Sequence, residues 1–132
     1  MSKIKTIILP LIIAILVIGC FFGASYLSDV KHYKRAVAEI SIADIDLSQI
    51  PDGVYDGSYD VGMISAEVEV VVSHGVIKTI NLIDHKNERG SSAEVITDTI
   101  IAQQKIDVDT VSGATNSSQV IKKAVAVALL QK

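Results

Sequence analysis

Residues 64–84 read ISAEVEVVVSHGVIKTINLID, and this stretch decides the fold. In its first half apolar side chains alternate with mostly polar ones, which is the period of a strand buried on one face. Residues 73–75 (SHG) predict a turn, after which the chain returns as a partner strand. Upstream, residues 53–60 (GVYDGSYD) predict a first strand, with Gly57 and Gly62 as bends or bulges. The sequence therefore predicts an antiparallel meander of three strands.

Two helices are predicted after the meander. Ser91 and Glu94 have the spacing of a capping box, and the helix that they open is expected to end near Gln104. Residues 106–109 (IDVD) suggest a short additional strand. Residues 116–130 predict the last helix, whose packed side is formed by Val120, Ile121, Ala124, Val125, Ala128 and Leu129. Strands followed by segregated helices indicate an α+β domain.

An apolar segment precedes this domain. Residues 6–27 (TIILPLIIAILVIGCFFGASYL) contain no charge, and as a helix they extend about 33 Å, enough for a hydrocarbon core of about 30 Å. Residues 28–43 predict a juxtamembrane helix or stalk, or a helix that simply continues from the membrane. We expect a membrane anchor over residues 1–27, a stalk over 28–51 and one folded domain over 52–132.

Charge and cysteine content narrow the function classes. All 15 acidic residues follow the apolar segment, and no Lys/Arg stripe is present, so a nucleic-acid partner is not expected. Cys20 excludes an intrachain disulfide because it is the single cysteine. It invites two interpretations: an apolar residue of a spanning helix, or the lipidated first residue of a mature lipoprotein, since residues 17–20 (VIGC) resemble a lipobox. Basic residues flank both ends of the segment, and its short N-terminal flank favours a signal anchor with the N-terminus inside.

The stretch that suggests chemistry is residues 109–118 (DTVSGATNSS), directly before the last helix. Gly113 and Ala114 permit the close approach of a bulky group, and the neighbouring hydroxyls and unpaired first-turn amides suit a phosphate. An ordinary N-cap turn, with Thr115 or Asn116 as the cap and Gln119 completing a capping box, is the alternative. The three histidines have no metal-ligand spacing, so no metal site is predicted, and no catalytic acid, base or nucleophile constellation is present.

Residues 109–115 (DTVSGAT) resemble the flavinylation motif Asp-x-x-(Ser/Thr)-Gly-Ala-(Thr/Ser) of the FMN-binding domain family. That family includes the flavin-bearing subunits of the sodium-pumping NADH:quinone reductase and of the Rnf complex, as well as small envelope proteins. The resemblance extends over about residues 52–131 and includes the order of the elements. The sequence departs from the family pattern at two places. Thr110 stands where family members often have glycine, and residues 85–90 (HKNERG) form the loop in which family members often carry a Glu-Thr-Pro-Gly type sequence.

The resemblance implies a covalent cofactor and assigns the residues around it. A separate flavin transferase would join FMN through its phosphate to the hydroxyl of Thr115 and would recognise Asp109, whose plainer interpretation is a turn-forming residue. The residues expected to bind the cofactor are Ser112, Gly113, Ala114, Asn116, Ser117, Ser118 and His85. Arg89 lies in the same loop as His85, and both could lie near the flavin or simply sit in solvent. Tyr55 and Tyr59 could stack on the ring, although packing against the core is the plainer use of both.

These expectations describe an extracytoplasmic, membrane-anchored electron carrier rather than an enzyme with its own substrate. Its expected partners are the membrane, the flavin transferase and a membrane redox partner of the quinone reductase or Rnf type. Two alternatives stay open: a non-redox module that binds FMN or another phosphate ligand reversibly, and a structural envelope protein without flavin.

Overall fold

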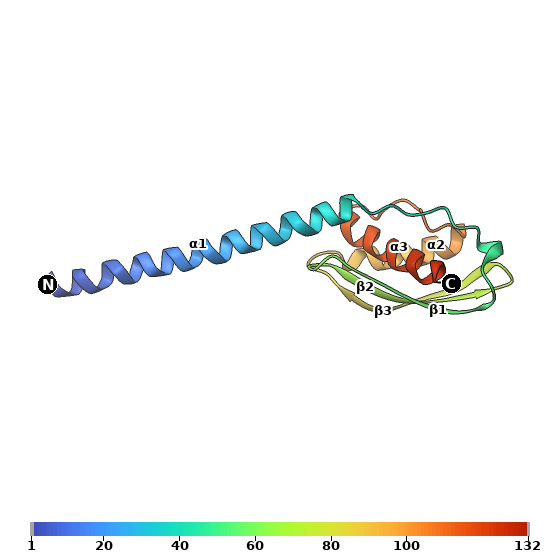
Figure 1. Ribbon diagram of the computed structural model, residues 1–132, viewed down its shortest axis with the longest axis horizontal. Helices are drawn as coiled ribbons and strands as arrows, with labels where there is room; N and C mark the ends of the chain where they lie inside the picture. Colours follow the sequence, from blue (N-terminus) through green and yellow to red (C-terminus); the bar gives the residue numbers. More distant parts are fainter. Residues whose placement is uncertain (1, 132) are drawn as a thin grey trace. The chain divides into compact units, whose positions relative to one another are not determined.

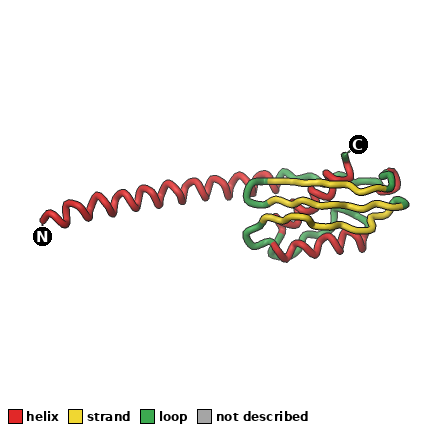
Figure 2. Tube along the Cα trace, turned by 90° about the horizontal axis from the view of Figure 1, so that it is seen from below, coloured by secondary structure: helices red, strands yellow, loops and turns green. Residues whose placement is uncertain are grey.

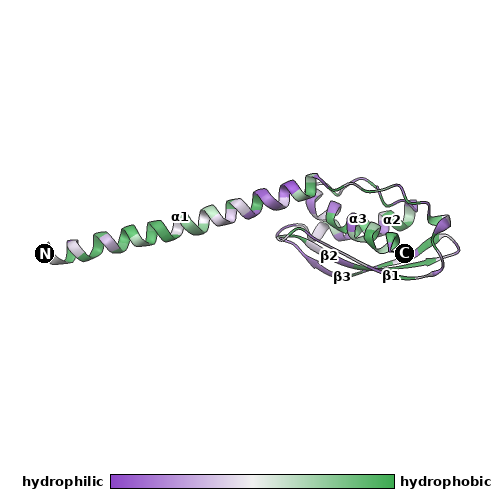
Figure 3. Cartoon of the chain, in the orientation of Figure 1, coloured by the Kyte–Doolittle hydropathy of each residue, from purple (hydrophilic) through white to green (hydrophobic). Residues whose placement is uncertain are grey.

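The computed structural model describes residues 2–131, and the chain divides after His32 into two compact units. The first unit belongs to helix α1 (Ser2–Ala38), which continues without a break from the apolar segment into the charged residues that follow. Figure 3 shows the change from apolar to polar residues along α1. From Ile4 onward α1 is long and apolar enough to cross a membrane, a test that signal sequences also pass.

The second unit begins at Tyr33, on the last turns of α1. Val37 is buried in its core, and Tyr33 packs against the same core. After α1, an extended segment leads to the 3₁₀ turn η1 (Leu47–Gln49), where Leu47 is also buried. In the structure, packing of this unit therefore starts well before residue 52, where the sequence suggested that the domain begins.

The three-stranded meander is confirmed. Strands β1 (Gly53–Asp60), β2 (Ser65–Ser73) and β3 (Val76–Lys86) pair antiparallel in the order β1-β2-β3 and lie side by side in Figure 2. His74 and Gly75, at φ 55° and 70°, form a two-residue turn of the kind that joins β-hairpins. The carboxylate of Asp52 accepts a hydrogen bond from the backbone N–H of His74 at 2.6 Å, which fixes this turn against the start of β1.

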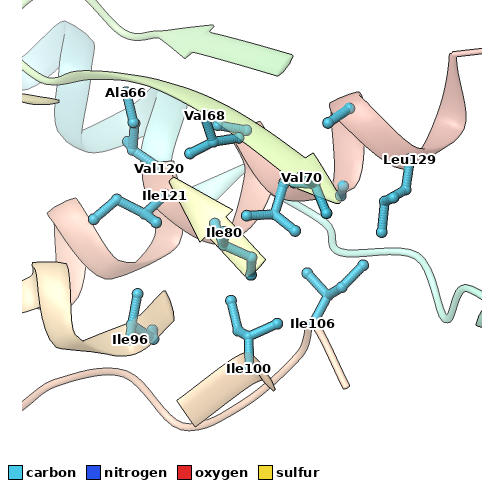
Figure 4. Close-up of a cluster of buried hydrophobic side chains, with 14 of the residues drawn as sticks. Ala66, Val68, Val70, Ile80, Ile96, Ile100, Ile106, Val120, Ile121 and Leu129 are labelled. Atoms are coloured by element: carbon cyan, nitrogen blue, oxygen red, sulfur yellow. The ribbon is translucent and has the colours of Figure 1, made fainter. Parts of the chain in front are cut away.

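One face of the sheet is covered by α2 (Ile96–Gln103) and α3 (Thr115–Leu130), as Figure 1 shows. The alternation in β2 sends every second side chain toward these helices. The side chains that meet between the sheet and the helices are aliphatic (Figure 4), and they include Ala66, Val68, Val70, Ile80, Ile96, Ile100, Val120 and Ile121. The predicted α+β class, an N-terminal apolar helix followed by a meander with two packed helices, is confirmed.

Gly57 is neither a bend nor a bulge, because it pairs regularly with Val68 in the middle of β1. The reason for glycine there is the close approach of α3: a Cβ at this position would collide with the backbone of Ala124 and Ala128. The bulges lie instead between β2 and β3, at Glu67/Val68 and Val71/Val72.

We predict that Gly57→Ala destabilises the folded domain by about 1–3 kcal/mol or more, because overfilling a packed interface forces the backbone to shift. Gly53→Ala is the matched control in the same strand, since a Cβ at Gly53 would meet only ordinary contacts, at 3.5 Å and beyond. Thermal unfolding followed by circular dichroism compares the two. Equal melting temperatures for both variants would contradict the close approach of α3 to β1.

Two local predictions were wrong. The Ser91 capping box does not form: residues Ser91–Val95 are a 3₁₀ turn (η2) with Gly90 at the N-cap and no side-chain cap, because Glu94 is hydrogen-bonded to His85 instead. Residues 106–109 form no strand, because they form a loop that is held by Lys122 of α3.

Candidate functional site

The N-terminus of α3 is uncapped. Ala114 is the N-cap residue and offers no side-chain acceptor, and the first helical hydrogen bond runs from the N–H of Ser118 to the carbonyl of Ala114. Within residues 2–131, nothing accepts from the backbone N–H groups of Thr115, Asn116 or Ser117. No acidic residue lies in the first turn. Three free donors at the positive end of a helix dipole form a site for an anion.

This helix end opens on a cavity of about 360 Å³. That volume lies at the lower end of the range for small-molecule sites, so a large ligand would stay partly exposed. Four separate parts of the second unit line it: the last turns of α1, the turn between β1 and β2, the loop after β3, and the start of α3 with the turn before it. The lining residues are Tyr33, Met63, Ile64, Glu88, Arg89, Gly90, Gly113, Ala114, Thr115, Asn116 and Ser117.

The loop after β3 is pressed against the start of α3. Gly90 touches Ser117 so closely that a Cβ on Gly90 would collide with the Ser117 hydroxyl. The side-chain oxygen of Asn87 accepts from the N–H of Gly90 at 2.9 Å and holds this part of the loop in place. Among the described lining residues Arg89 is the one cation, and it is exposed. The loop therefore brings one cation, Arg89, and one carboxylate, Glu88, to the cavity that the free amides face.

Comparison with known proteins agrees with this geometry. The sequence profile of one family, described as FMN-binding domain, matches residues 61–130, more than half of the chain. The chain belongs to the FMN-binding domain family. It is also 28% identical over 126 residues to an uncharacterized protein of Treponema pallidum (strain Nichols), a match that covers 90% of this chain. The chain spans about a third (34%) of that relative's length. No solved structure matches.

The FMN-binding domain of this chain has residues that fit its cofactor. The free amides of α3 and the Arg89 guanidinium suit a phosphate, and no first-turn carboxylate opposes it. A Cβ at Gly113 would meet nothing within 4 Å, so the turn before α3 leaves open space. Tyr33 and Met63, both partly exposed, supply apolar surface for a ring system. Flavin binding is thus the function that family and cavity support together.

Five of the eight residues predicted to carry or bind the cofactor reach the cavity of the FMN-binding domain. Gly113, Ala114, Thr115, Asn116 and Ser117 line it, and Thr115 is exposed as the first residue of α3. The alternative of an N-cap at Thr115 or Asn116 is wrong, since Ala114 occupies the cap position.

Ser112, Ser118 and His85 are not among the lining residues, so their predicted contacts with the cofactor stay predictions. Ser118 is fully buried, and its hydroxyl accepts from the N–H of Val111 at 3.0 Å, which fixes the turn of the motif. Its own backbone N–H donates to the carbonyl of Ala114, so it is not one of the free amides at this helix start. The His85 ring, 2% exposed, lies against Glu94 at 3.1 Å. Asp109 is exposed on the loop.

Tyr33, Met63 and Glu88 are cavity residues that the sequence did not suggest. Tyr33 and Met63 lie far from the motif along the chain, and no local pattern links them to it. Tyr55 and Tyr59, which could have stacked on a flavin, instead pack against the core. The hydroxyl of Tyr55 donates to the carbonyl of Pro51 at 2.7 Å.

Lys122 of α3 clamps the segment that leads into the motif. Its ammonium donates to the Asp107 carboxylate and to the carbonyl of Val108, each at 2.7 Å, while the side chain is almost fully buried. The hydrogen bond and the positive charge of Lys122 hold the pKa of Asp107 below its ordinary value. This role could not be predicted from the sequence. A lysine next to the apolar stripe of a helix is ordinarily expected at the solvent-exposed edge of that stripe, whereas Lys122 is buried.

We predict that Lys122→Met destabilises the domain by about 1–2 kcal/mol at pH 7, chiefly by leaving the Val108 carbonyl without its donor. Asp107 is largely exposed, so its ion pair adds little. The pKa of the Asp107 carboxyl is lower in the folded than in the unfolded chain. The small contribution of its ion pair to the free energy of unfolding is therefore present above about pH 4 and is lost as the pH falls through the folded pKa.

The difference in melting temperature between parent and Lys122→Met should therefore narrow from pH 7 to pH 3. Lys123→Met is the control, because Lys123 donates to the Ser41 carbonyl in an exposed bond. A difference that widens toward pH 3 would contradict the assignment of the clamp.

Proposed function

We propose that this chain is a membrane-anchored extracytoplasmic flavoprotein that carries FMN covalently on Thr115 and acts as an electron carrier. The observation that carries the proposal is the position of one hydroxyl. Thr115 is the last residue of the DTVSGAT motif and the first residue of α3, it is exposed, and it lines the cavity beside the free amides.

Attachment makes one phosphoester bond. The donor would be a flavin dinucleotide: the Thr115 oxygen bonds to the phosphorus next to the flavin, the pyrophosphate bond breaks, and the nucleoside monophosphate leaves while the hydroxyl proton is released. The net addition to the chain is one FMN less one water. The phosphodiester that results keeps one negative charge. The amides of Thr115, Asn116 and Ser117 and the guanidinium of Arg89 are placed to stabilise it. When bound, FMN supplies the redox chemistry, and the protein supplies position and electrostatics.

Tether length supports a partner in or at the membrane. Leu27 ends the apolar segment, and Tyr33, six positions later, lines the cavity. A segment of this length extends over at most about 22 Å, whatever the orientation of the two units. An anchor in the apolar segment therefore keeps the cofactor close to the membrane surface. We propose a membrane redox partner of the quinone reductase or Rnf type, and a flavin transferase that recognises the exposed Asp109.

The intact mass of the protein purified from its own membranes tests these points together. The expected mass is that of the full chain plus one FMN less one water. A smaller mass that corresponds to a chain beginning at a lipidated Cys20 would show that the anchor is a lipid rather than a spanning helix. The proposal for the cofactor would not change. Protein isolated with the attaching machinery present but without flavin would contradict the proposal.

A second candidate function is reversible binding of FMN or another phosphate ligand by a non-redox module. The free amides and Arg89 favour it, since they would hold a phosphate without any bond to Thr115. Denaturation separates the two candidates, because a reversibly bound flavin leaves the unfolded chain and an esterified one remains on it.

A further inference from the structure

The cavity contains one aromatic side chain, and it comes from the helix that carries the apolar segment. Among the described lining residues, Tyr33 is the sole aromatic residue, and it lies on the last turns of α1. Its apolar companions are Met63 and Ile64, of which Ile64 is largely buried in the core, at 7% exposure. Ala114, which also lines the cavity, is 5% exposed, so Tyr33 and Met63 are the partly exposed apolar residues of the wall.

Tyr33 is held in place by the packing of its own helix. Val37 lies one turn further along α1 and is 6% exposed in the core of the second unit. The Tyr33 ring packs partly against that core and partly faces the cavity. Within the described part of the chain, no group forms a hydrogen bond with its hydroxyl. A preorganised ring with a free polar tip suits contact with a planar heteroaromatic group.

We infer that Tyr33 is the residue against which the flavin ring of the bound cofactor lies, with the phosphate held at the start of α3. The inference rests on the proposed function and deepens it. The phosphate-holding groups come from the motif and from the loop after β3, whereas the ring-contacting group comes from α1. The helix that would tether the protein thus contributes a residue of its last turns, Tyr33, to the cofactor site.

Flavin fluorescence is the direct readout. A phenol in contact with a photo-excited flavin passes it an electron and takes the electron back, which quenches emission without net chemistry. Phenylalanine keeps the ring and its packing but is not oxidised in this way, whereas tryptophan is oxidised more readily than tyrosine. We expect emission per bound FMN to rise severalfold in Tyr33→Phe and to stay low in Tyr33→Trp.

The experiment uses the full chain, produced together with a flavin transferase and purified from membranes. Intact mass gives the FMN content of each variant, so that emission is compared per attached flavin. Tyr59→Phe is the matched control, because Tyr59 packs against the core outside the cavity, and its emission should equal that of the parent. Removing a single hydroxyl preserves the packing at both positions, and circular dichroism verifies that each variant is folded.

The outcomes separate this inference from the proposed function. Fully loaded Tyr33→Phe with the emission of the parent would overturn the contact with Tyr33 and leave the flavoprotein assignment intact. Equal increases in Tyr33→Phe and Tyr59→Phe would also overturn it, since the effect would then not depend on the cavity. A parent chain without flavin in the presence of the transferase would overturn the proposed function and this inference with it.

Discussion

Thr115→Ala is expected to abolish covalent flavin completely, whereas Thr115→Ser is expected to retain it. The phosphoester needs a hydroxyl oxygen at this position, and serine supplies one with the same reach from the backbone. Fluorescence of the denatured protein band, together with intact mass, measures the result after production with a flavin transferase. The parent and Thr115→Ser should show the FMN adduct, and Thr115→Ala the mass of the bare chain.

The fold should not be affected by the change to alanine. Thr115 is exposed, its side chain caps nothing, and alanine is favourable in a helix. Surface substitutions of this kind usually change stability by less than about 0.5 kcal/mol. Loss of flavin from a variant with the melting temperature of the bare parent chain would therefore report chemistry rather than unfolding.

Ser112→Ala and Ser117→Ala are the controls, since both remove a neighbouring hydroxyl of the same stretch. Ser112 is exposed and is not among the lining residues, whereas Ser117 lines the cavity and is buried in contact with Gly90. Both variants should keep the adduct. A fluorescent band that survives Thr115→Ala and disappears in one of these variants would move the attachment point to that serine.

The strands and the last helix were predictable because their signal is local. The alternation from Ile64 to Val72 and the apolar stripe from Val120 to Leu129 each describe one face of one element, which is what burial imposes. The motif was predictable for the same reason, because its residues are consecutive and lie at a helix start. Local pattern thus predicted the fold class, and it also identified the residue that we propose as the attachment point.

The features that were missed depend on contacts between distant segments. Gly57 suggested a bend, because glycine is conformationally permissive and the sequence does not show that a helix packs against this position. Glu94 had the spacing of a cap, yet its carboxylate pairs with His85 across the fold. Likewise, the cavity wall joins Tyr33, Met63 and Arg89 from three elements, and tertiary packing alone brings them together.

The role of α1 in the domain leads to the second large effect. We predict that a chain starting at residue 52, where the sequence suggested that the domain begins, does not fold, whereas a chain starting at Asp29 folds. The shorter chain loses the buried side chains of Val37 and Leu47, each worth about 1.5–3 kcal/mol. It also loses Tyr33 from the cavity wall. Domains of this size have about 5–15 kcal/mol of stability in total, so the loss removes much of it.

Cooperative thermal unfolding, followed by circular dichroism, distinguishes the two chains, and flavin loading by a transferase gives a second measurement. The chain from Asp29 should unfold in one sharp transition and accept FMN, and the chain from residue 52 should do neither. A matched control is the chain from Asp29 with Val37→Asp, which keeps the length but places a charge in the core. If the chain from residue 52 unfolded as sharply as the longer chain, the prediction would be wrong. The helix α1 would then serve only as a tether and would not be needed for the domain to fold.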